Sequence, residues 1–522
     1  GGDGSTSQGD FHEMLNFASL HRLPLVIVIQ DNGWAISVPV SEQTAGGTIS
    51  TMAKGYEGLD VHEIDGTDFV ATTMVMEAAC ARARAGSGPS LIVAHVPRLG
   101  PHSSSDDPKK YQTDTVRAEC VAADPVPRFK AWLIQQGILD AAEIEFIERR
   151  ISVEVEEAAV LAEATDRPSP DTADQHVFQA SPVTETPSQT EGESIVLMDA
   201  IAHAITEEME DDPKVIVFGQ DVAHGKGGVF GITRGLTETF GPHRCFNTPL
   251  AESTIIGLAI GLSATGRFKP IAEIQFVDYS WTGMNQIVNE LASYHYRSKG
   301  QWRCPVVIRM PYGGYIQGGP YHSQSIEAIF AHCPGLKIVI PSNAADAKRL
   351  FKAALRDPNP VIFLEHKALY RQRLFSARPE PDRFALLPLG KAAVIREGTD
   401  LTYVGWGMTA LMGYEAAEAL AKEGISIEVI DLRTIVPLDE ATILSSVKKT
   451  GKLLVAHEAP KNCGVGAEIV ARLSEAAFSY LDAPPQRIAS LNCPVPYSKE
   501  LEDAVLPQKE TILSAMRELA SY

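Results

Sequence analysis

The chain has 522 residues, of which 44% are hydrophobic and 21% are charged, and its formal net charge at pH 7 is −20. A chain of this length has room for about three domains, each with its own core, and the composition is that of an ordinary globular protein. The acidic balance leaves no basic surface for a phosphate backbone, which argues against nucleic acid as a partner.

The seven cysteines are scattered and form no C-x-x-C pair. This pattern favours a reducing compartment over a disulfide framework or a zinc site, and we expect a cytoplasmic protein. No apolar run approaches the roughly 20 residues that a membrane-spanning helix needs, so no membrane association is expected.

Short apolar runs alternate with helical patterns along most of the chain. Runs without polar alternation are typical of parallel strands covered on both faces, which predicts an α/β fold with parallel sheets flanked by helices. The predicted strands are residues 25–29, 91–94, 215–218, 306–309, 337–340, 401–404, 427–430 and 453–456.

Proline-rich polar stretches divide the chain. Residues 166–193 read as a linker, because they offer little apolar surface to offset their ordering entropy. A long amphipathic helix is predicted at 142–163 before the linker, and a helix capped by Ser194 after it. A second break lies near 377–387, so the predicted blocks are 1–165, 194–375 and 376–522.

Gly2-Asp3-Gly4 opens the chain, and Asn32 follows the first predicted strand. Ligands bind at the carboxyl ends of strands in open α/β sheets. Magnesium prefers oxygen ligands, and Asp3, Asn32 and a backbone carbonyl just beyond Asn32 would supply three, with phosphate filling other positions. The alternative interpretation is two ordinary turns, since GDG and DN are common turn sequences.

The segments from Gly2 to Glu13 and from Gln30 to Ser37 are similar to the thiamine diphosphate motif of 2-oxo acid dehydrogenases. The resemblance implies that Asp3, Asn32 and the Trp34 carbonyl bind magnesium. Asp31 and Trp34 stand where that family usually has Asn and Tyr, and neither change removes a side-chain ligand. The cofactor-binding residues implied by the whole resemblance are Gly2, Asp3, Gly4, Asn32, Trp34, Ala35, Ile36, Glu252, Phe276 and Tyr279.

The resemblance extends over nearly the whole chain. Residues 1–165 look like the carboxyl half of the family's α subunit, and residues 194–522 look like its β subunit, fused in one polypeptide. This implies a diphosphate-binding domain at 1–165, a pyrimidine-binding domain at 194–375 and a transketolase carboxyl-terminal-like α/β domain at 376–522.

Residues 100–107 read Gly-Pro-His-Ser-Ser-Ser-Asp-Asp and resemble the loop that places a histidine beside the cofactor. The resemblance implies that His102 is catalytic, which suits a side chain that titrates near neutral pH. The alternative is a surface loop in which Asp106 and Asp107 are merely solvated. Pro101 stands where the family often has a second histidine.

Glu252 precedes an apolar helical run at 255–260. A carboxylate there is commonly an N-terminal acid that interacts with the helix dipole. The resemblance implies instead the catalytic glutamate, which hydrogen-bonds the aminopyrimidine of the cofactor and so activates it. Burial raises the pKa of such a carboxyl, which would suit this role.

Two further segments resemble parts of the same pocket. Phe276 and Tyr279 lie in a segment similar to the strand and turn that pack the aminopyrimidine, although aromatic residues there fit a plain core equally well. His322, in Tyr-His-Ser-Gln-Ser, resembles the family's second catalytic histidine, which implies substrate carboxylate binding or proton transfer.

The resemblance implies an acyl-transferring 2-oxo acid dehydrogenase that decarboxylates a branched-chain substrate of the 3-methyl-2-oxobutanoate type. Its partners would be the 2-oxo acid and the lipoyl group of a dihydrolipoyl acyltransferase. The branched-chain assignment rests on Ala35-Ile36-Ser37 and on the contexts of His102 and His322. Because the cofactor would lie between two blocks, we also expect a homodimer of fused chains.

Several alternatives stay open. They are a pyruvate or acetoin dehydrogenase component, a transketolase-like or deoxyxylulose phosphate synthase-like enzyme, and a non-catalytic remnant that binds partners. Only Gly1 precedes the GDG turn, where a buried strand is expected. We therefore interpret the sequence as an amino-terminally truncated piece of a longer fused enzyme, and expect it to bind the cofactor weakly.

Overall fold

The computed structural model describes residues 1–186 and 192–522. The chain forms two compact units, Gly1–Ala173 and Asp174–Tyr522, which we call unit 1 and unit 2. Among the described residues, no helix is both long enough and apolar enough to cross a membrane.

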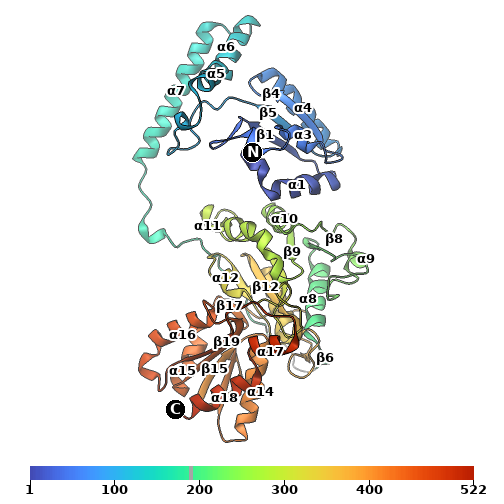
Figure 1. Cartoon of the computed structure of the whole chain (residues 1–522), viewed down its shortest axis with the longest axis vertical. Coiled ribbons are helices and arrows are strands. Elements are labelled where there is room, and N and C mark those ends of the chain that lie inside the picture. The colour runs from blue at the N-terminus through green and yellow to red at the C-terminus, as the bar shows by residue number, and fades with distance from the viewer. Residues whose placement is uncertain (187–191) are drawn as a thin grey trace. The chain divides into compact units, whose positions relative to one another are not determined.

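Unit 1 is built on a three-stranded parallel sheet in the order β1-β5-β4 (Figure 1). The strands are β1 (Val26–Asp31), β4 (Asp60–Asp65) and β5 (Ser90–His95). The start of the chain lies beside β1: the Gly1 carbonyl accepts the Gln30 N–H at 2.8 Å, and Gly2 forms a parallel bridge with Gln30. The GDG turn is therefore held at the carboxyl end of β1 by pairing of the two residues that open the chain.

The core of unit 1 is small and apolar. Its buried residues come from two helices and two strands and are Phe11, Leu15, Ile29, Ile49, Ala53, Leu91 and Val93. The helices and short elements of the unit are η1 (Asp3–Ser7), α1 (Gly9–Leu20), β2 (Trp34–Ala35), β3 (Val38–Pro39), α2 (Val40–Gln43), α3 (Ile49–Ala53), α4 (Phe69–Arg84), η2 (Pro108–Lys110), α5 (Asp114–Ala122), α6 (Pro125–Gln135), α7 (Ala141–Ala164) and η3 (Pro170–Thr172).

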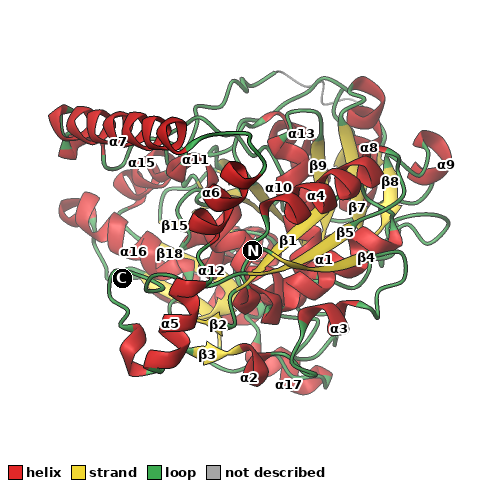
Figure 2. Cartoon of the chain, turned by 90° about the horizontal axis from the view of Figure 1, so that it is seen from above, coloured by secondary structure: helices red, strands yellow, loops and turns green. Residues whose placement is uncertain are grey.

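Helix α7 is the longest helix of unit 1 and runs without interruption (Figures 1 and 2). Asp140 and Glu143 form a capping box at its start, which satisfies two of the backbone N–H groups that a helix leaves free there. None of its residues is fully buried, and only Ile144 and Ile147 are partly buried, so the predicted amphipathic helix exists but most of its apolar side is exposed.

Unit 2 contains a seven-stranded sheet in the order β17-β11-β12-β10-β9-β7-β8, in which all neighbours are parallel except β11 and β17. The strands are β7 (Val215–Gly219), β8 (Cys245–Asn247), β9 (Lys269–Glu273), β10 (Val307–Tyr312), β11 (Lys337–Val339), β12 (Val361–His366) and β17 (Thr434–Val436). One face packs on α8 (Leu197–Asp211) and α13 (Ala344–Arg356), and the other on α10 (Glu252–Ala264).

A second sheet of five strands, in the order β14-β16-β15-β18-β19, forms the carboxyl-terminal part of unit 2. Its strands are β14 (Ala393–Arg396), β15 (Leu401–Gly405), β16 (Ile427–Asp431), β18 (Leu453–Pro460) and β19 (Gln486–Ser490). Helices α14 (Met408–Ala421), α15 (Glu440–Thr450), α16 (Val465–Ala476), α17 (Lys499–Val505) and α18 (Lys509–Ala520) belong to this part. Because β17 joins the first sheet, the two α/β parts share one hydrophobic core.

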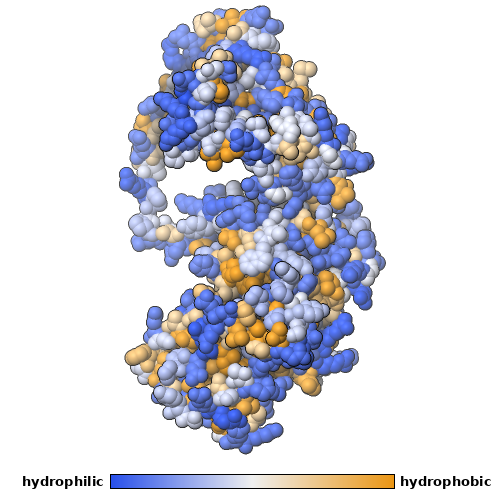
Figure 3. Space-filling view, in the orientation of Figure 1, coloured by the Kyte–Doolittle hydropathy of each residue, from blue (hydrophilic) through white to orange (hydrophobic). Residues whose placement is uncertain are grey.

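The remaining elements of unit 2 are short. They are β6 (Ser194–Ile195), α9 (Leu236–Phe240), η4 (Val277–Gly283), η5 (Gln286–Leu291), α11 (Tyr294–Arg297), α12 (Glu327–Ala331), η6 (Lys367–Leu369), β13 (Arg378–Pro379) and η7 (Phe478–Tyr480). Hydrophilic side chains cover most of the face shown in Figure 3, with hydrophobic residues scattered among them.

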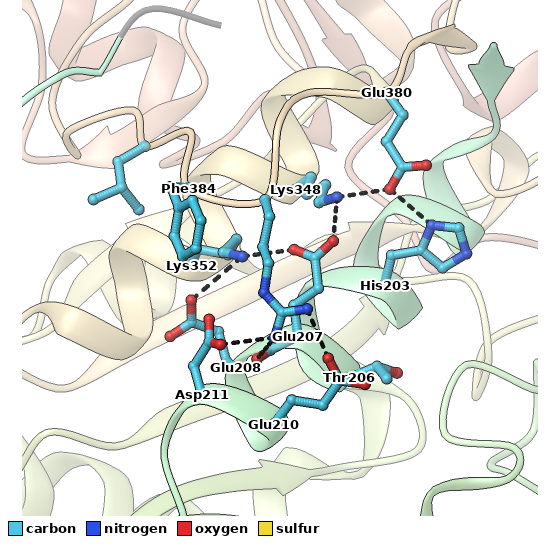
Figure 4. A network of polar contacts seen from close by, with 12 residues as sticks. His203, Thr206, Glu207, Glu208, Glu210, Asp211, Lys348, Lys352, Glu380 and Phe384 are labelled. Atoms are coloured by element: carbon cyan, nitrogen blue, oxygen red, sulfur yellow. Dashed lines mark hydrogen bonds and ion pairs between the residues drawn. The ribbon is translucent and has the colours of Figure 1, made fainter. Parts of the chain in front are cut away.

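Helices α8 and α13 are joined by a charged network as well as by apolar packing (Figure 4). Lys348 and Lys352 are buried, and each donates to a Glu207 carboxylate oxygen at 2.6 Å. Lys348 also reaches Glu380 at 2.6 Å. The buried lysines of this interface are thus paired, as buried charges generally must be.

The predicted fold class is confirmed, and each predicted strand is present with ends shifted by a few residues. The helix start at Ser194 is wrong. Ser194 and Ile195 form β6, which pairs with β13, and α8 begins at Leu197 without a side-chain cap. Strand pairing with β13, which lies far along the chain, therefore determines the structure at Ser194, although the local sequence favours a helix cap there.

The predicted linker at 166–193 includes residues 187–191, which lie outside the described residues. Its middle part is attached to unit 2. The Gln179 N–H donates to Asn359 at 2.7 Å, and the Thr186 N–H donates to the Leu386 carbonyl at 3.2 Å.

Candidate active site

The carboxyl end of β1 brings Asp3 and Asn32 to the same edge of the unit 1 sheet. Asp3 begins η1 and is 2% exposed, yet its Oδ2 has no hydrogen-bond partner among the described residues. Burial raises the pKa of the Asp3 carboxyl, and the charge of Asp31 raises it further, against backbone hydrogen bonds that lower it. Asn32 follows β1 directly, and its Oδ1 accepts the Trp34 N–H at 3.1 Å.

Close packing explains the second glycine of the GDG turn. A Cβ at Gly4 would lie 2.7 Å from the Ala35 Cβ, so a larger residue would push η1 away from β2. The next residue, Ile36, has a φ of 57°, a conformation that is strained for a β-branched side chain. Its carbonyl accepts a hydrogen bond from Arg98 Nη1 at 2.7 Å, which holds this segment in place.

His102 lies on an exposed loop that polar contacts organise. Its backbone N–H donates to Asp106 Oδ2 at 2.8 Å, and the Tyr111 hydroxyl donates to the same oxygen at 2.7 Å. Arg98 hydrogen-bonds the Tyr111 hydroxyl, which links the loop to Ile36. Asp106 therefore shapes the loop and is more than a solvated charge. Arg98 and Tyr111 were not predicted, although Arg98 follows the carboxyl end of a predicted strand.

A hollow of about 620 Å³ lies at this edge of the unit 1 sheet, with Asp31, Asn32, Trp34, His95 and Arg128 among its lining residues. Within the described residues, no three His, Cys, Asp or Glu side chains are grouped as metal ligands. The predicted magnesium ligands are not a group of this type, because they are one carboxylate, one amide and one backbone carbonyl.

In unit 2, Glu252 is the first residue of α10, where the positive end of the helix dipole favours a carboxylate. Gln220 Nε2 donates to Glu252 Oε1 at 2.8 Å, and Thr282 Oγ1 donates to Oε2 at 3.0 Å. These two donors fix the plane of the carboxylate. Glu252 is half-buried.

Phe276, Tyr279 and His322 form a cluster in unit 2. The Tyr279 hydroxyl lies 2.7 Å from His322 Nε2, and the Phe276 and His322 rings meet edge to face with centroids 4.7 Å apart. Burial raises the pKa of the Tyr279 hydroxyl, as do the charges of Asp278 and Glu252. The two aromatic residues thus contact a candidate catalytic histidine.

Element η4 connects the two halves of this cluster. Tyr279 within it contacts His322, and Thr282 within it donates to Glu252. Unit 2 therefore brings all four of its predicted site residues together. Gln220 and Thr282 were missed. Gln220 follows the predicted strand at 215–218 and so could have been suspected, whereas Thr282 has no comparable signal.

Three families match the chain in succession. Residues 1–171 match "Dehydrogenase E1 component", residues 193–373 match "Transketolase, pyrimidine binding domain", and residues 390–512 match "Transketolase, C-terminal domain".

Known relatives match about two thirds of the chain. The 2-oxoisovalerate dehydrogenase subunit beta of Bacillus subtilis is 48% identical over 326 residues, which are 62% of this chain and 98% of the relative. The pyruvate dehydrogenase E1 component subunit beta of Acholeplasma laidlawii is 44% identical over the same shares. A 2-oxoisovalerate dehydrogenase subunit beta 2 from Arabidopsis thaliana is 46% identical over 66% of this chain and 95% of its own length.

A solved structure described as "Split gene transketolase, inactive beta4 tetramer" shares the fold, with a TM-score of 0.51, 22% identity, and coverage of 63% of this chain and 99% of that one. The order of the matched families and the identity to whole β subunits agree. The chain belongs to the thiamine diphosphate-dependent 2-oxo acid dehydrogenase E1 components, as an E1 α-like domain fused to the transketolase-type pyrimidine-binding and C-terminal domains of a β subunit.

Proposed function

We propose that the chain decarboxylates a branched-chain 2-oxo acid of the 3-methyl-2-oxobutanoate type and transfers the acyl group to the lipoyl group of a dihydrolipoyl acyltransferase. The observation that carries the proposal is the cluster around η4, where Glu252 and His322 are held by neighbouring side chains. In the overall reaction the carboxyl group leaves as carbon dioxide. The lipoyl disulfide opens to a thioester and a thiol, and so accepts the two electrons.

Glu252 is assigned to the aminopyrimidine of thiamine diphosphate. Its two oxygens each accept one hydrogen bond from the protein, which leaves further lone pairs for a ring nitrogen. An oriented carboxyl of this kind can exchange a proton with that nitrogen. When bound, thiamine diphosphate supplies the carbon nucleophile and the electron sink for decarboxylation. Phe276 and Tyr279 are assigned to packing beside it.

His322 and His102 are assigned to the substrate. In unit 2, the contact between His322 Nε2 and Tyr279 leaves Nδ1 of His322 available for a substrate carboxylate or a proton. In unit 1, His102 is exposed on a loop that Asp106 holds through the His102 backbone N–H, which leaves the His102 ring free of that contact. Both residues would assist acyl transfer.

The magnesium and diphosphate sites are assigned to unit 1. The buried, unpartnered Oδ2 of Asp3 fits a cation, because a bound Mg²⁺ would satisfy an oxygen that the described residues leave without a hydrogen bond. Asn32 Oδ1 and the Trp34 carbonyl complete the proposed set. Gly2, Gly4, Ala35 and Ile36 would lie beside the diphosphate.

The choice of substrate is the finer part of the proposal. The Ala35-Ile36-Ser37 run supports a branched-chain substrate, whereas relatives named for both 2-oxoisovalerate and pyruvate resemble this chain closely. We expect a higher kcat/KM on 3-methyl-2-oxobutanoate than on pyruvate, measured with an artificial electron acceptor. A preference for pyruvate would overturn the substrate assignment and leave the reaction type standing.

We further propose the domain division 1–165, 194–375 and 376–522.

We also propose a homodimeric assembly. Large apolar side chains are exposed in unit 2 beside both candidate catalytic residues: Leu250 is 84% exposed and Tyr321 is 73% exposed. Such residues are typical of a surface that another protein covers. Mass photometry is expected to show a dimer, and an active monomer would contradict this.

A further inference from the structure

Lys367 is a buried cation that lacks a hydrogen-bond partner. It begins η6, directly after β12, and is 5% exposed, and its Nζ has no hydrogen-bond partner among the described residues. The other buried lysines are paired, namely Lys337 with Asp357 at 2.6 Å, and Lys348 and Lys352 with Glu207. A buried ammonium without a direct partner is costly, so its retention needs a reason.

The surroundings of Lys367 point toward the candidate active site. Its Nζ lies 5.6 Å from the centroid of the Phe276 ring, whose edge meets His322. Asp278, two residues after Phe276, interacts electrostatically with both Lys367 and His322. The other charged groups that act on Lys367 are Glu458 of β18 and Glu502 of α17.

Those two glutamates are already engaged elsewhere. Glu458 accepts hydrogen bonds from Gly314, Ser325 and His366, and Glu502 accepts the backbone N–H groups of Ile316 and Gln317. Asp278 is different, because its Oδ2 is buried without a hydrogen-bond partner among the described residues. Lys367 and Asp278 are therefore two opposite charges, each incompletely satisfied, in one buried region.

Asp278 also holds the segment that carries His322. Its Oδ1 accepts the Gln324 N–H at 3.0 Å, two residues beyond His322. Ser323, which precedes Gln324, is fully buried, and Ser325, which follows it, donates to Glu458 at 3.0 Å, so the segment is held on both sides of this hydrogen bond. A charged Asp278 makes this hydrogen bond stronger than a neutral carboxyl would.

We propose that Lys367 is a positioning residue whose ammonium compensates the charge of Asp278, so that Asp278 can hold Gln324 and thereby keep His322 against Phe276 and Tyr279. This inference rests on the proposed role of His322 in the reaction. Lys367 does not touch the reacting atoms in this account and acts only through Asp278.

The arrangement has a consequence for pH dependence. Burial lowers the pKa of Lys367 to about 8, against the attraction of Asp278, Glu458 and Glu502. Below that pH the ammonium is charged and compensates Asp278. As the pH rises through about 8 the ammonium charge is lost, Asp278, whose pKa burial already raises, loses its compensating cation, and activity is expected to fall.

The test compares Lys367→Arg and Lys367→Met with the full chain over a range of pH. The wild type is expected to lose kcat/KM with a midpoint near pH 8. Lys367→Arg stays charged and is expected to keep its activity through that range. Lys367→Met is expected to be about tenfold to a hundredfold less active at neutral pH, as misplaced catalytic groups are. Lys348→Arg, at a paired buried lysine on α13, should keep the wild-type pH profile.

The proposal is overturned if Lys367→Arg shows the same alkaline decline as the wild type, or if folded Lys367→Met has wild-type kcat/KM. A second measurement does not depend on activity. Amide hydrogen exchange at Gln324 should be faster in Lys367→Met than in the wild type, with exchange in β10 unchanged. Unchanged exchange at Gln324 would contradict the positioning role even if the chain proved inactive, which separates this failure from failure of the proposed function.

Discussion

Two groups of buried charges in unit 2 differ in how completely they are paired. Arg309, at the centre of the seven-stranded sheet, donates to Glu273 and to both oxygens of Glu365. Lys367 and Asp278, beside His322, attract each other electrostatically, but the Lys367 Nζ and one Asp278 oxygen lack hydrogen-bond partners among the described residues. The first group binds neighbouring strands of a sheet, and the second lies next to candidate catalytic residues.

The difference separates charges that serve stability from charges that serve a site. In a network such as that of Arg309, each charged group is already paired, so none is free to bind a ligand. Removing one member leaves the opposite charges of the others buried without a partner. Groups with unused hydrogen-bonding capacity, such as Asp278 and Asp3, are costly in a folded protein, and at a candidate site a ligand or a mobile proton can use them. Changes in the two groups should therefore affect different measured quantities.

Glu252→Gln should have the largest effect of the substitutions predicted here, and this effect should be on activity and not on stability. Glutamine keeps the shape but cannot exchange a proton with the aminopyrimidine, so kcat should fall by about 10²- to 10⁴-fold. Because Glu252 is half-buried at a helix start, the unfolding temperature should stay close to that of the wild type. Steady-state decarboxylation and thermal unfolding check both parts. A variant that keeps wild-type kcat would remove Glu252 from the mechanism.

Arg309→Met should have the opposite signature. It leaves Glu273 and Glu365 buried without their cation, which is expected to cost about 3–5 kcal/mol of unfolding free energy. Burial raises the pKa of Glu273 to about 7 even with Arg309 present. Urea unfolding measures the loss. Combining the change with Glu273→Gln and Glu365→Gln should recover part of it. A loss below about 1 kcal/mol would show that the paired network does not serve stability.

Asp3→Asn tests the unpartnered carboxylate of unit 1. Magnesium-dependent binding of thiamine diphosphate should weaken by at least about tenfold, a factor that even the outer-shell partners of metal sites can reach. Isothermal titration with and without magnesium measures this. Asp114→Asn, on the exposed start of α5, is the matched control and should leave the affinity unchanged. Equal affinities for Asp3→Asn and the wild type would exclude Asp3 as a ligand.

Arg149→Ala should have the smallest effect and sets the baseline for exposed charges. Arg149 pairs with Glu145 at 2.6 Å on the surface of α7, where both side chains are about 70% exposed. Such pairs contribute less than about 0.5 kcal/mol, so urea unfolding should barely change. A loss comparable to that of Arg309→Met would mean that burial does not explain the contrast between the charge groups.

Much of the fold was predictable because continuous apolar runs mark the strands that are covered on both faces. Strand β4 was missed because Asp60–Asp65 is mostly polar, with only Val61 and Ile64 apolar, and none of its residues is fully buried. The Ser194 error has a related cause. The pairing of β6 with β13 joins segments about 180 residues apart, and no local rule detects it.

The site was predictable where residues sit in motifs and unpredictable where the fold alone assembles them. Asp3, Asn32 and Glu252 lie at strand ends or helix starts that the sequence marks, whereas His322 lies in a loop and was predicted from its Tyr-His-Ser-Gln-Ser context. The electrostatic interaction of Lys367 with Asp278 arises from their burial in the folded protein and leaves no sequence signal. Gly4 was predicted only in part: the sequence indicated its motif, but not its close contact with Ala35.

We propose that this chain decarboxylates a 2-oxo acid and that Glu252 is its essential acid. The most direct test measures release of labelled carbon dioxide from carboxyl-labelled 3-methyl-2-oxobutanoate, with saturating thiamine diphosphate and magnesium, for the wild type and Glu252→Gln. We expect cofactor-dependent release of carbon dioxide by the wild type and a loss of about 10²-fold or more in the variant. Equal release by both proteins, or none by the wild type, would contradict it.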